Sequence, residues 1–194
     1  IWPDAAPLRI LAILQNRWFR GSRFRNRLQE VPSRISAKIQ NDVLVQYTEL
    51  NRGLSLNDTL VSLVQKTGRK IVFVIDEWDS MIRETPGDSE AQDRYLNLLH
   101  GWFKNNNFTP KVIAAAYMTG ILPIKKDGSQ SAISDFTEYP ILEPCEYAEY
   151  TGFTEDEVRN LCVKYGMDFK EAKEWYDGYD FPQTGAIYNP YSMM

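Results

Sequence analysis

Apolar residues along the chain occur either in short unbroken runs or at every third or fourth position. Unbroken runs are typical of strands buried on both faces of a parallel sheet, and the wider spacing is typical of helices. The runs predict strands over residues 8–14, 70–75, 111–118 and 137–142. The wider spacing predicts helices over residues 32–47, 56–65 and 89–104. Because strands alternate with helices, the pattern indicates an α/β fold with a parallel sheet and flanking helices.

The pattern changes after Pro144, where short helices and aromatic residues replace the apolar runs. A capping box at residues 154–157 predicts a helix over residues 155–165. A second cap at Asp168 predicts another helix, which ends at Gly178. This part of the chain is therefore expected to be a small helical appendage.

These patterns divide the chain into an α/β core over residues 1–145 and a small helical subdomain over residues 146–194. Asn189 followed by Pro190 is typical of the start of a helix, so a helix is expected to begin where the sequence stops. The first residue is Ile1 rather than Met. We therefore expect the chain to be a fragment and its helical subdomain to be truncated.

Composition and charge narrow the class of protein. Hydrophobic residues make up 43% of the chain and charged residues 25%, as in globular domains with a core. The formal net charge of -4 argues against a chain that wraps nucleic acid by charge alone, because neutralising phosphates needs an excess of Lys and Arg. Cys145 and Cys162 lack the spacing of a zinc site, and no apolar run is long enough to cross a bilayer. A cytoplasmic location is expected.

The strongest chemical signal is the sequence IVFVIDEWD over residues 71–79. A strand of bulky aliphatic residues that ends in Asp-Glu places both carboxylates at the carboxyl edge of the sheet, where ligands bind in open α/β folds. The segment predicts a Walker B role, with Asp76 as the Mg²⁺ ligand and Glu77 orienting the attacking water. Asp79 is a further candidate cofactor-binding residue. The simpler alternative is a buried strand that runs into an acidic surface loop.

The next apolar run, VIAAAYMTG over residues 112–120, ends in Thr119. Thr119 occupies the place where ATPases with a Walker B strand carry a sensor. Such a sensor is a hydroxyl or amide that contacts the γ-phosphate and the attacking water. It is therefore a candidate catalytic and cofactor-binding residue, beside the alternative of a threonine that only ends a strand. The two strand ends together predict that the substrate is ATP and the cofactor Mg²⁺.

Other chemistry stays open for the acidic segment. Asp76, Glu77 and Asp79 could hold a metal ion for phosphodiester hydrolysis, although no lysine lies at the spacing found in nucleases. His100 is the only histidine and falls on a predicted helix, so histidine-based triads and zinc sites are hard to build. We interpret His100 as structural.

Phosphates could be bound by a phosphate-binding loop or by basic residues. The sequence has no GxxxxGK[ST] loop, which would supply the backbone N–H groups that hold phosphates. Residues 17–27 contain five arginines among aromatic residues and are a candidate for contact with nucleic acid, with a solvated loop as the alternative. Lys125 and Lys126 are candidates for contact with phosphates, with an exposed lysine pair as the alternative.

Several sequence blocks occur together in one order. They are FVIDEWDSMIRE (73–84), VIAAAYMTGILPIKK (112–126), GFTEDEV (152–158), WYDGY (175–179) and YNPYS (188–192). By these blocks the chain resembles the AAA-ATPase-like family of bacterial proteins, whose members often carry a C-terminal PD-(D/E)XK nuclease-like domain. The resemblance runs from about residue 8 to the end of the chain.

The resemblance implies part of a P-loop NTPase sheet with flanking helices, followed by a helical lid. It implies Walker B roles for Asp76 and Glu77 and a sensor role for Thr119. The family's phosphate loop would precede Ile1 and its nuclease-like domain would follow Met194. We therefore expect ATP hydrolysis with Mg²⁺ in the full-length protein, an inactive fragment, and a nuclease-like domain or effector as partner.

A rival interpretation belongs to another class of function. The chain could be a non-catalytic interaction module, or a nucleic-acid-binding module, on a degenerate ATPase scaffold. In that case the aromatic residues Trp175, Tyr176 and Tyr179, or the arginines of residues 17–27, would contact the partner.

Overall fold

The computed structural model describes residues 8–10, 30–123, 136–176, 178–182 and 184–193. The chain divides into two compact units, residues 1–136 and residues 137–194. The sequence pattern places this division after residue 145.

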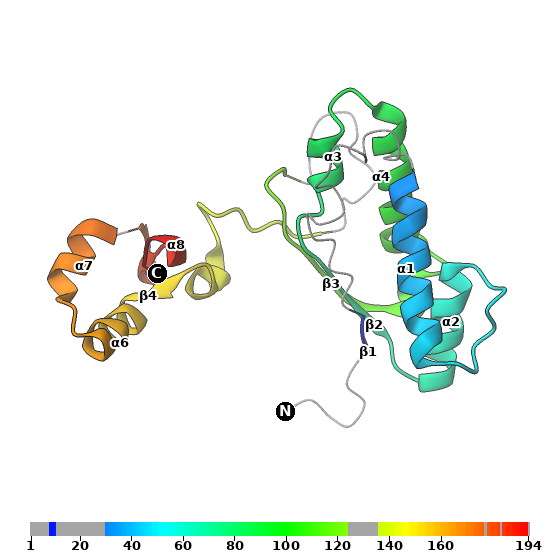
Figure 1. Ribbon diagram of the computed structural model, residues 1–194, viewed down its shortest axis with the longest axis horizontal. Helices are drawn as coiled ribbons and strands as arrows, with labels where there is room; N and C mark the ends of the chain where they lie inside the picture. Colours follow the sequence, from blue (N-terminus) through cyan, green and yellow to red (C-terminus); the bar gives the residue numbers. More distant parts are fainter. Residues whose placement is uncertain (1–7, 11–29, 124–135, 177, 183, 194) are drawn as a thin grey trace. The chain divides into compact units, whose positions relative to one another are not determined.

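The first unit is built on a three-stranded parallel sheet with the order β1-β2-β3 (Figure 1). The strands are β1 (Leu8–Ile10), β2 (Ile71–Ile75) and β3 (Ile113–Met118). At the carboxyl ends of the two longer strands, Ile75 is paired with Met118. The predicted parallel arrangement is confirmed for these strands, and residues 11–14 lie outside the described residues.

Helices were predicted at three places in this unit, and each is confirmed. The described helices are α1 (Val31–Gln46), α2 (Leu56–Thr67), α3 (Ser80–Glu84), α4 (Ser89–Phe103) and α5 (Thr109–Val112). The hydroxyl of Ser55 accepts the N–H of Asp58 and caps the start of α2. The same helix ends at Gly68, whose φ of 66° lies in the left-handed region that favours glycine.

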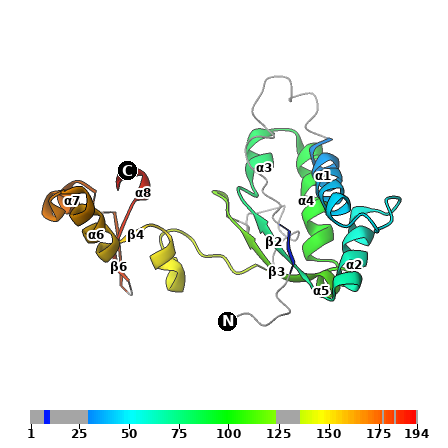
Figure 2. The same ribbon diagram turned by 60° about the horizontal axis from the view of Figure 1, so that its bottom comes forward.

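One face of the sheet is covered by α1, α2 and α4, which lie together beside it in both views (Figure 1, Figure 2). Alternate residues of β2 point into this core, where Ile71, Phe73 and Ile75 are fully buried. The rings of Phe73 and Trp102 are 5.4 Å apart. The helices add the buried side chains Ile35, Ile39, Leu60, Leu63, Tyr95, Leu99 and Trp102. Removal of this apolar surface from water fixes the position of β2.

The prediction that both faces of the third strand are buried is wrong. Ala114, Ala115 and Tyr117 are exposed, and Tyr117 keeps 63% of its surface. β3 forms an edge of the described sheet, so its outer positions are open to solvent. Residues 111–112, predicted as strand, belong to α5, whose first turn contains Pro110. Proline is favoured in the first turn of a helix, where its missing N–H costs nothing.

The strand predicted over residues 137–142 is absent from the structure. Pro140 lies within this segment and lacks the N–H that a strand ladder needs. Its carbonyl instead accepts the N–H of Glu143 at 2.9 Å, which closes a turn.

The second unit combines short helices with a small antiparallel sheet of order β4-β6-β5. Its elements are η3 (Cys145–Tyr150), β4 (Phe153–Thr154), α6 (Glu155–Tyr165), α7 (Phe169–Tyr176), β5 (Tyr179–Phe181), β6 (Gly185–Tyr188) and α8 (Pro190–Met193). The capping box predicted at the start of α6 is confirmed, because Thr154 and Glu157 exchange side-chain and backbone hydrogen bonds.

The prediction of a purely helical appendage is corrected by this sheet. Its strands are two to four residues long, too short to show an alternating pattern in the sequence. Val158 and Cys162 of α6, Ala172 of α7 and Tyr188 of β6 form one of its buried clusters. Among the described helices of the whole chain, none has the length and apolar character needed to cross a membrane.

Candidate active site

The carboxyl ends of β2 and β3 bring Asp76 and Thr119 into direct contact. Asp76 and Glu77 directly follow β2, and Thr119 directly follows β3. The N–H of Thr119 donates to the carbonyl of Ile75 at 2.9 Å and so continues the ladder beyond the strands. The hydroxyl of Thr119 then donates to Oδ1 of Asp76. Because the strands are parallel, two segments distant in sequence meet at the same edge of the sheet.

Thr119 also fixes the backbone that follows Asp76. Its Oγ1 accepts the N–H of Glu77 at 3.1 Å, and its carbonyl accepts the N–H of Trp78 at 2.8 Å. Glu77 itself has a φ of 52°, in the left-handed region that residues other than glycine rarely adopt. The chain therefore turns sharply at Glu77, in a conformation held by hydrogen bonds to the neighbouring strand end.

The carboxylate of Glu77 is partly exposed and ion-paired. Oε2 of Glu77 accepts a hydrogen bond from Nη2 of Arg83 at 3.3 Å, and the Glu77 side chain is 36% exposed. Arg83 lies one turn into α3, six residues after Glu77 in the sequence. Arg83 is not among the site residues predicted from the sequence, although its spacing of four residues from Asp79 is the spacing of a helical ion pair.

Asp79 lies beneath this surface and is fully buried. Its Oδ2 accepts hydrogen bonds from Nε of Arg83 at 2.9 Å, from the N–H of Ile121 at 3.2 Å and from the N–H of Leu122 at 2.9 Å. Asp79 was predicted from the sequence to be a cofactor-binding residue. In the structure its contacts are with Arg83 and with the backbone that follows Thr119.

Trp78 and Gly120 pack closely where these two segments meet. A Cβ atom at Gly120 would lie 2.5 Å from ring atoms of Trp78 and 3.0 Å from Oδ1 of Asp79. The carbonyl of Trp78 accepts a hydrogen bond from the hydroxyl of Tyr95 at 2.7 Å. Burial, and secondarily the charge of Asp79, raise the pKa of Tyr95, so this phenol stays protonated and remains a donor. Only glycine fits at position 120 without a shift of its neighbours.

Asp76 places at this edge the kind of ligand that Mg²⁺ takes from proteins. Mg²⁺ is commonly held by one or two carboxylates while phosphates and waters complete its shell. Asp76 supplies one exposed carboxylate at the edge. Within the described residues, no group of three or more His, Cys, Asp or Glu could hold a metal ion without such outside ligands.

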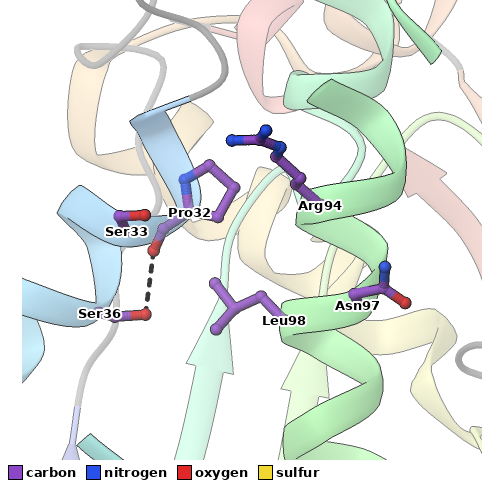
Figure 3. Close-up of a pocket in the computed structure, with 6 residues that line it drawn as sticks. All are labelled: Pro32, Ser33, Ser36, Arg94, Asn97 and Leu98. Carbon is purple, nitrogen blue, oxygen red and sulfur yellow. Dashed lines mark hydrogen bonds between the residues drawn. The ribbon is translucent and has the colours of Figure 1, made fainter. Parts of the chain in front are cut away.

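Surface pockets occur elsewhere in the first unit. One of about 390 Å³ lies between α1 and α4 (Figure 3). It is lined by Pro32, Ser33, Ser36, Arg94, Asn97 and Leu98. Another, of about 690 Å³, lies beside α4 and α5 and includes the exposed His100. Neither pocket includes Asp76, Glu77 or Thr119, so the candidate site is an open sheet edge and not one of these hollows.

Two basic segments were also predicted from the sequence to contact nucleic acid or phosphates. Residues 17–27, with their five arginines, and the pair Lys125 and Lys126 lie outside the described residues.

Comparison with known proteins identifies a family. Among curated proteins and among solved structures, none matches the chain. A family described as predicted AAA-ATPase matches residues 12–129, which include β2, β3 and all the residues of the candidate site. Because this match covers more than half of the sequence, the chain belongs to the AAA-ATPase-like family.

Proposed function

We propose that the complete gene product hydrolyses ATP with Mg²⁺, and that Asp76, Glu77 and Thr119 form part of its catalytic site. The observation that carries this proposal is the hydrogen bond between Thr119 and Asp76 across the carboxyl ends of β2 and β3. Ligands of open α/β folds bind outside this edge of the sheet. Family membership supports the same assignment.

Asp76 is the residue that would hold Mg²⁺. Its carboxylate is exposed, and the hydroxyl of Thr119 restrains its orientation. A bound Mg²⁺ would neutralise the negative charge that develops during phosphoryl transfer. Asp76 would therefore determine where the phosphates lie relative to the two strand ends.

Glu77 and Thr119 would act on the attacking water and the γ-phosphate. The carboxylate of Glu77 can accept a hydrogen bond from water and so orient its lone pair for attack. The hydroxyl of Thr119 has one hydrogen, which it donates to Asp76 in this structure, so it would contact the γ-phosphate by exchanging that partner. Its backbone and its contact with the N–H of Glu77 would meanwhile keep the two strand ends together.

The finer assignment of the two units follows family analogy. Residues 1–136 would be part of a P-loop sheet with its flanking helices, and residues 137–194 would be part of the lid. A nuclease-like domain or effector would be the partner that hydrolysis controls.

Substitution of Glu77 by Gln tests the proposal. In the complete gene product, Glu77→Gln is expected to lower kcat for ATP by about 100-fold or more, because the amide cannot accept a proton or polarise the water. Affinity for Mg-ATP, measured by calorimetry, is expected to stay within about threefold, because Glu77 acts in the chemical step. Glu84→Gln is the matched control, since Glu84 is an exposed residue at the end of α3. Turnover that is unchanged by Glu77→Gln would refute the role of Glu77.

A second candidate function rests on aromatic side chains of the second unit. Trp175 is 74% exposed, Tyr179 43% and Tyr191 88%. Exposed aromatic residues are enriched at the centres of protein interfaces. A complete gene product that neither binds nor hydrolyses ATP would favour this interaction module over the ATPase.

A further inference from the structure

One guanidinium group joins the two carboxylates that flank Trp78. Arg83 donates from Nε to Asp79 and from Nη2 to Glu77, at 2.9 Å and 3.3 Å. Its side chain is 27% exposed, so the contact is partly shielded from water. Arginine suits this arrangement because its planar group presents several donors in a fixed geometry.

Asp79, one of the two carboxylates that contact Arg83, is itself held in place by further hydrogen bonds. It is fully buried, and the same Oδ2 that contacts Arg83 also accepts the N–H groups of Ile121 and Leu122. The segment that follows Thr119 and the guanidinium of Arg83 are thus held by one oxygen atom. Glu77 is the outermost member of the set and the one with the most solvent around it.

We propose that Arg83 is a positioning residue that holds the carboxylate of Glu77 relative to the Thr119 strand end, with Asp79 as its anchor. This inference rests on the proposed role of Glu77 in hydrolysis. Without Arg83, the Glu77 side chain samples several rotamers, and only some of them direct an oxygen toward the attacking water. A misplacement of about 1 Å is enough to lower a rate by about 100-fold.

Kinetics of the complete gene product test the positioning role. Arg83→Ala is expected to lower kcat about tenfold and to leave KM for ATP within about twofold, because Arg83 acts through Glu77 and not on the nucleotide. The kcat of Arg83→Lys is expected to lie between the values of the unchanged protein and of Arg83→Ala, since lysine keeps the charge but is a poor substitute for the two-point contact. It also keeps the test decisive should the alanine variant fail to fold.

Arg94→Ala is the matched control. Arg94 lies on α4, away from the ends of β2 and β3 in sequence, and forms the same kind of ion pair, with Glu90 four residues earlier. It is expected to retain the kcat of the unchanged protein. Equal kcat values for Arg83→Ala and Arg94→Ala would overturn the inference, and so would a higher kcat for Arg83→Ala.

A double substitution separates positioning from general stability. If Arg83 works through Glu77, Arg83→Ala adds no further loss of kcat to the Glu77→Gln protein, because residues that act as a unit are non-additive. A further tenfold loss in that background would show that Arg83 acts by another route, and would overturn the inference.

Hydrogen exchange provides a readout that needs neither nucleotide nor turnover. In the nucleotide-free protein, Arg83→Ala is expected to speed exchange of the Ile121 and Leu122 amides about tenfold, because Asp79 loses the partner that fixes its carboxylate. The amides of β2 are expected to keep their rates, and Arg94→Ala is expected to change neither set. Unchanged exchange at both amides in Arg83→Ala would overturn the anchoring by Asp79.

The outcomes also distinguish this inference from the proposed function. Full turnover in Glu77→Gln would refute the catalytic role of Glu77, whatever Arg83 does. Loss of turnover in Glu77→Gln together with normal turnover in Arg83→Ala and Arg83→Lys would refute the positioning role alone.

Discussion

The hydroxyl group of Thr119 connects the two segments of the candidate site. It donates to Asp76 and accepts from the N–H of Glu77, while the backbone of Thr119 pairs with Ile75 and Trp78. A single residue therefore fixes both the side chain that would hold Mg²⁺ and the backbone that carries Glu77. Thr119 thus contacts each of these groups directly, through its hydroxyl group or its backbone.

Gly120 limits how closely the two segments approach each other. Gly120→Ala is expected to lower the free energy of unfolding by about 1–3 kcal/mol, because the new methyl group would overlap the Trp78 ring. Gly101→Ala is the matched control, since no atom lies within 4 Å of its added Cβ and it sits inside α4. Replacing a helical glycine should stabilise the protein by about 0.5–1 kcal/mol. Urea unfolding measures both, and a destabilisation of equal size in the two variants would contradict the packing argument.

At the residue scale, the sequence predicted the strand-end residues but not the contacts between them. Asp76, Glu77 and Thr119 were identified because each directly follows an apolar run. Arg83 was not predicted, because its contact with Glu77 depends on the left-handed turn at Glu77. No local sequence pattern predicts that turn. The burial of Asp79 was missed for a similar reason, since its partners at residues 121–122 are distant in sequence.

Helix α6 shows how charges join two neighbouring elements. Glu155 pairs with Arg159 one turn later at 2.5 Å and with Lys173 of α7 at 3.1 Å. The hydrogen bond from Arg159, followed by that from Lys173, lowers the pKa of Glu155 below its ordinary value of 4.5. A lowered pKa means that the folded protein favours the ionised carboxylate.

The pH dependence of unfolding follows from this shift. The contribution of Glu155 is present above pH 4.5, the ordinary pKa, and is lost as the pH falls through the lowered pKa of the folded state. Glu155→Gln is therefore expected to lower the melting temperature slightly near neutral pH and to have a smaller effect in acid. Thermal unfolding of both proteins at low salt measures this. High salt is the control, because it screens exposed pairs. A larger effect of the substitution in acid than at neutral pH would contradict the assignment.

At the element scale, long elements with regular spacing were predicted best. Helices α1, α2 and α4 follow clear spacing, and the capping box of α6 marks a helix start that the structure confirms. The errors concern short elements and edges. Strands β4, β5 and β6 are too short for a visible pattern, and the exposure of β3 depends on what lies beside it.

At the scale of the whole molecule, each unit has its own buried clusters. The larger cluster joins β2 to α1, α2 and α4, and two smaller clusters lie in the second unit. The order of elements predicted the parallel sheet, because parallel strands need crossover connections. The sequence did not predict the antiparallel sheet, whose pairing of β4 with β6 joins residues on either side of two helices.

The candidate site uses the larger unit as a rigid support. The side chains that fix β2 are buried on the face next to the helices, while Asp76 is exposed at the end of the same strand. Burial along β2 and exposure at its tip allow a stable strand to present polar groups to a ligand. A magnesium nucleotide is therefore expected to bind where β2 and β3 end.

Replacement of Mg²⁺ by paramagnetic Mn²⁺ tests this claim most directly. In the complete gene product with ATP, Mn²⁺ is expected to broaden the amide NMR signals of Asp76, Glu77 and Thr119 more than those of His100 and Leu98, which lie by the two pockets. Asp76→Asn is expected to weaken this broadening by removing the charged ligand. Selective broadening beside either pocket, or broadening at the strand ends that Asp76→Asn does not change, would contradict the proposed site.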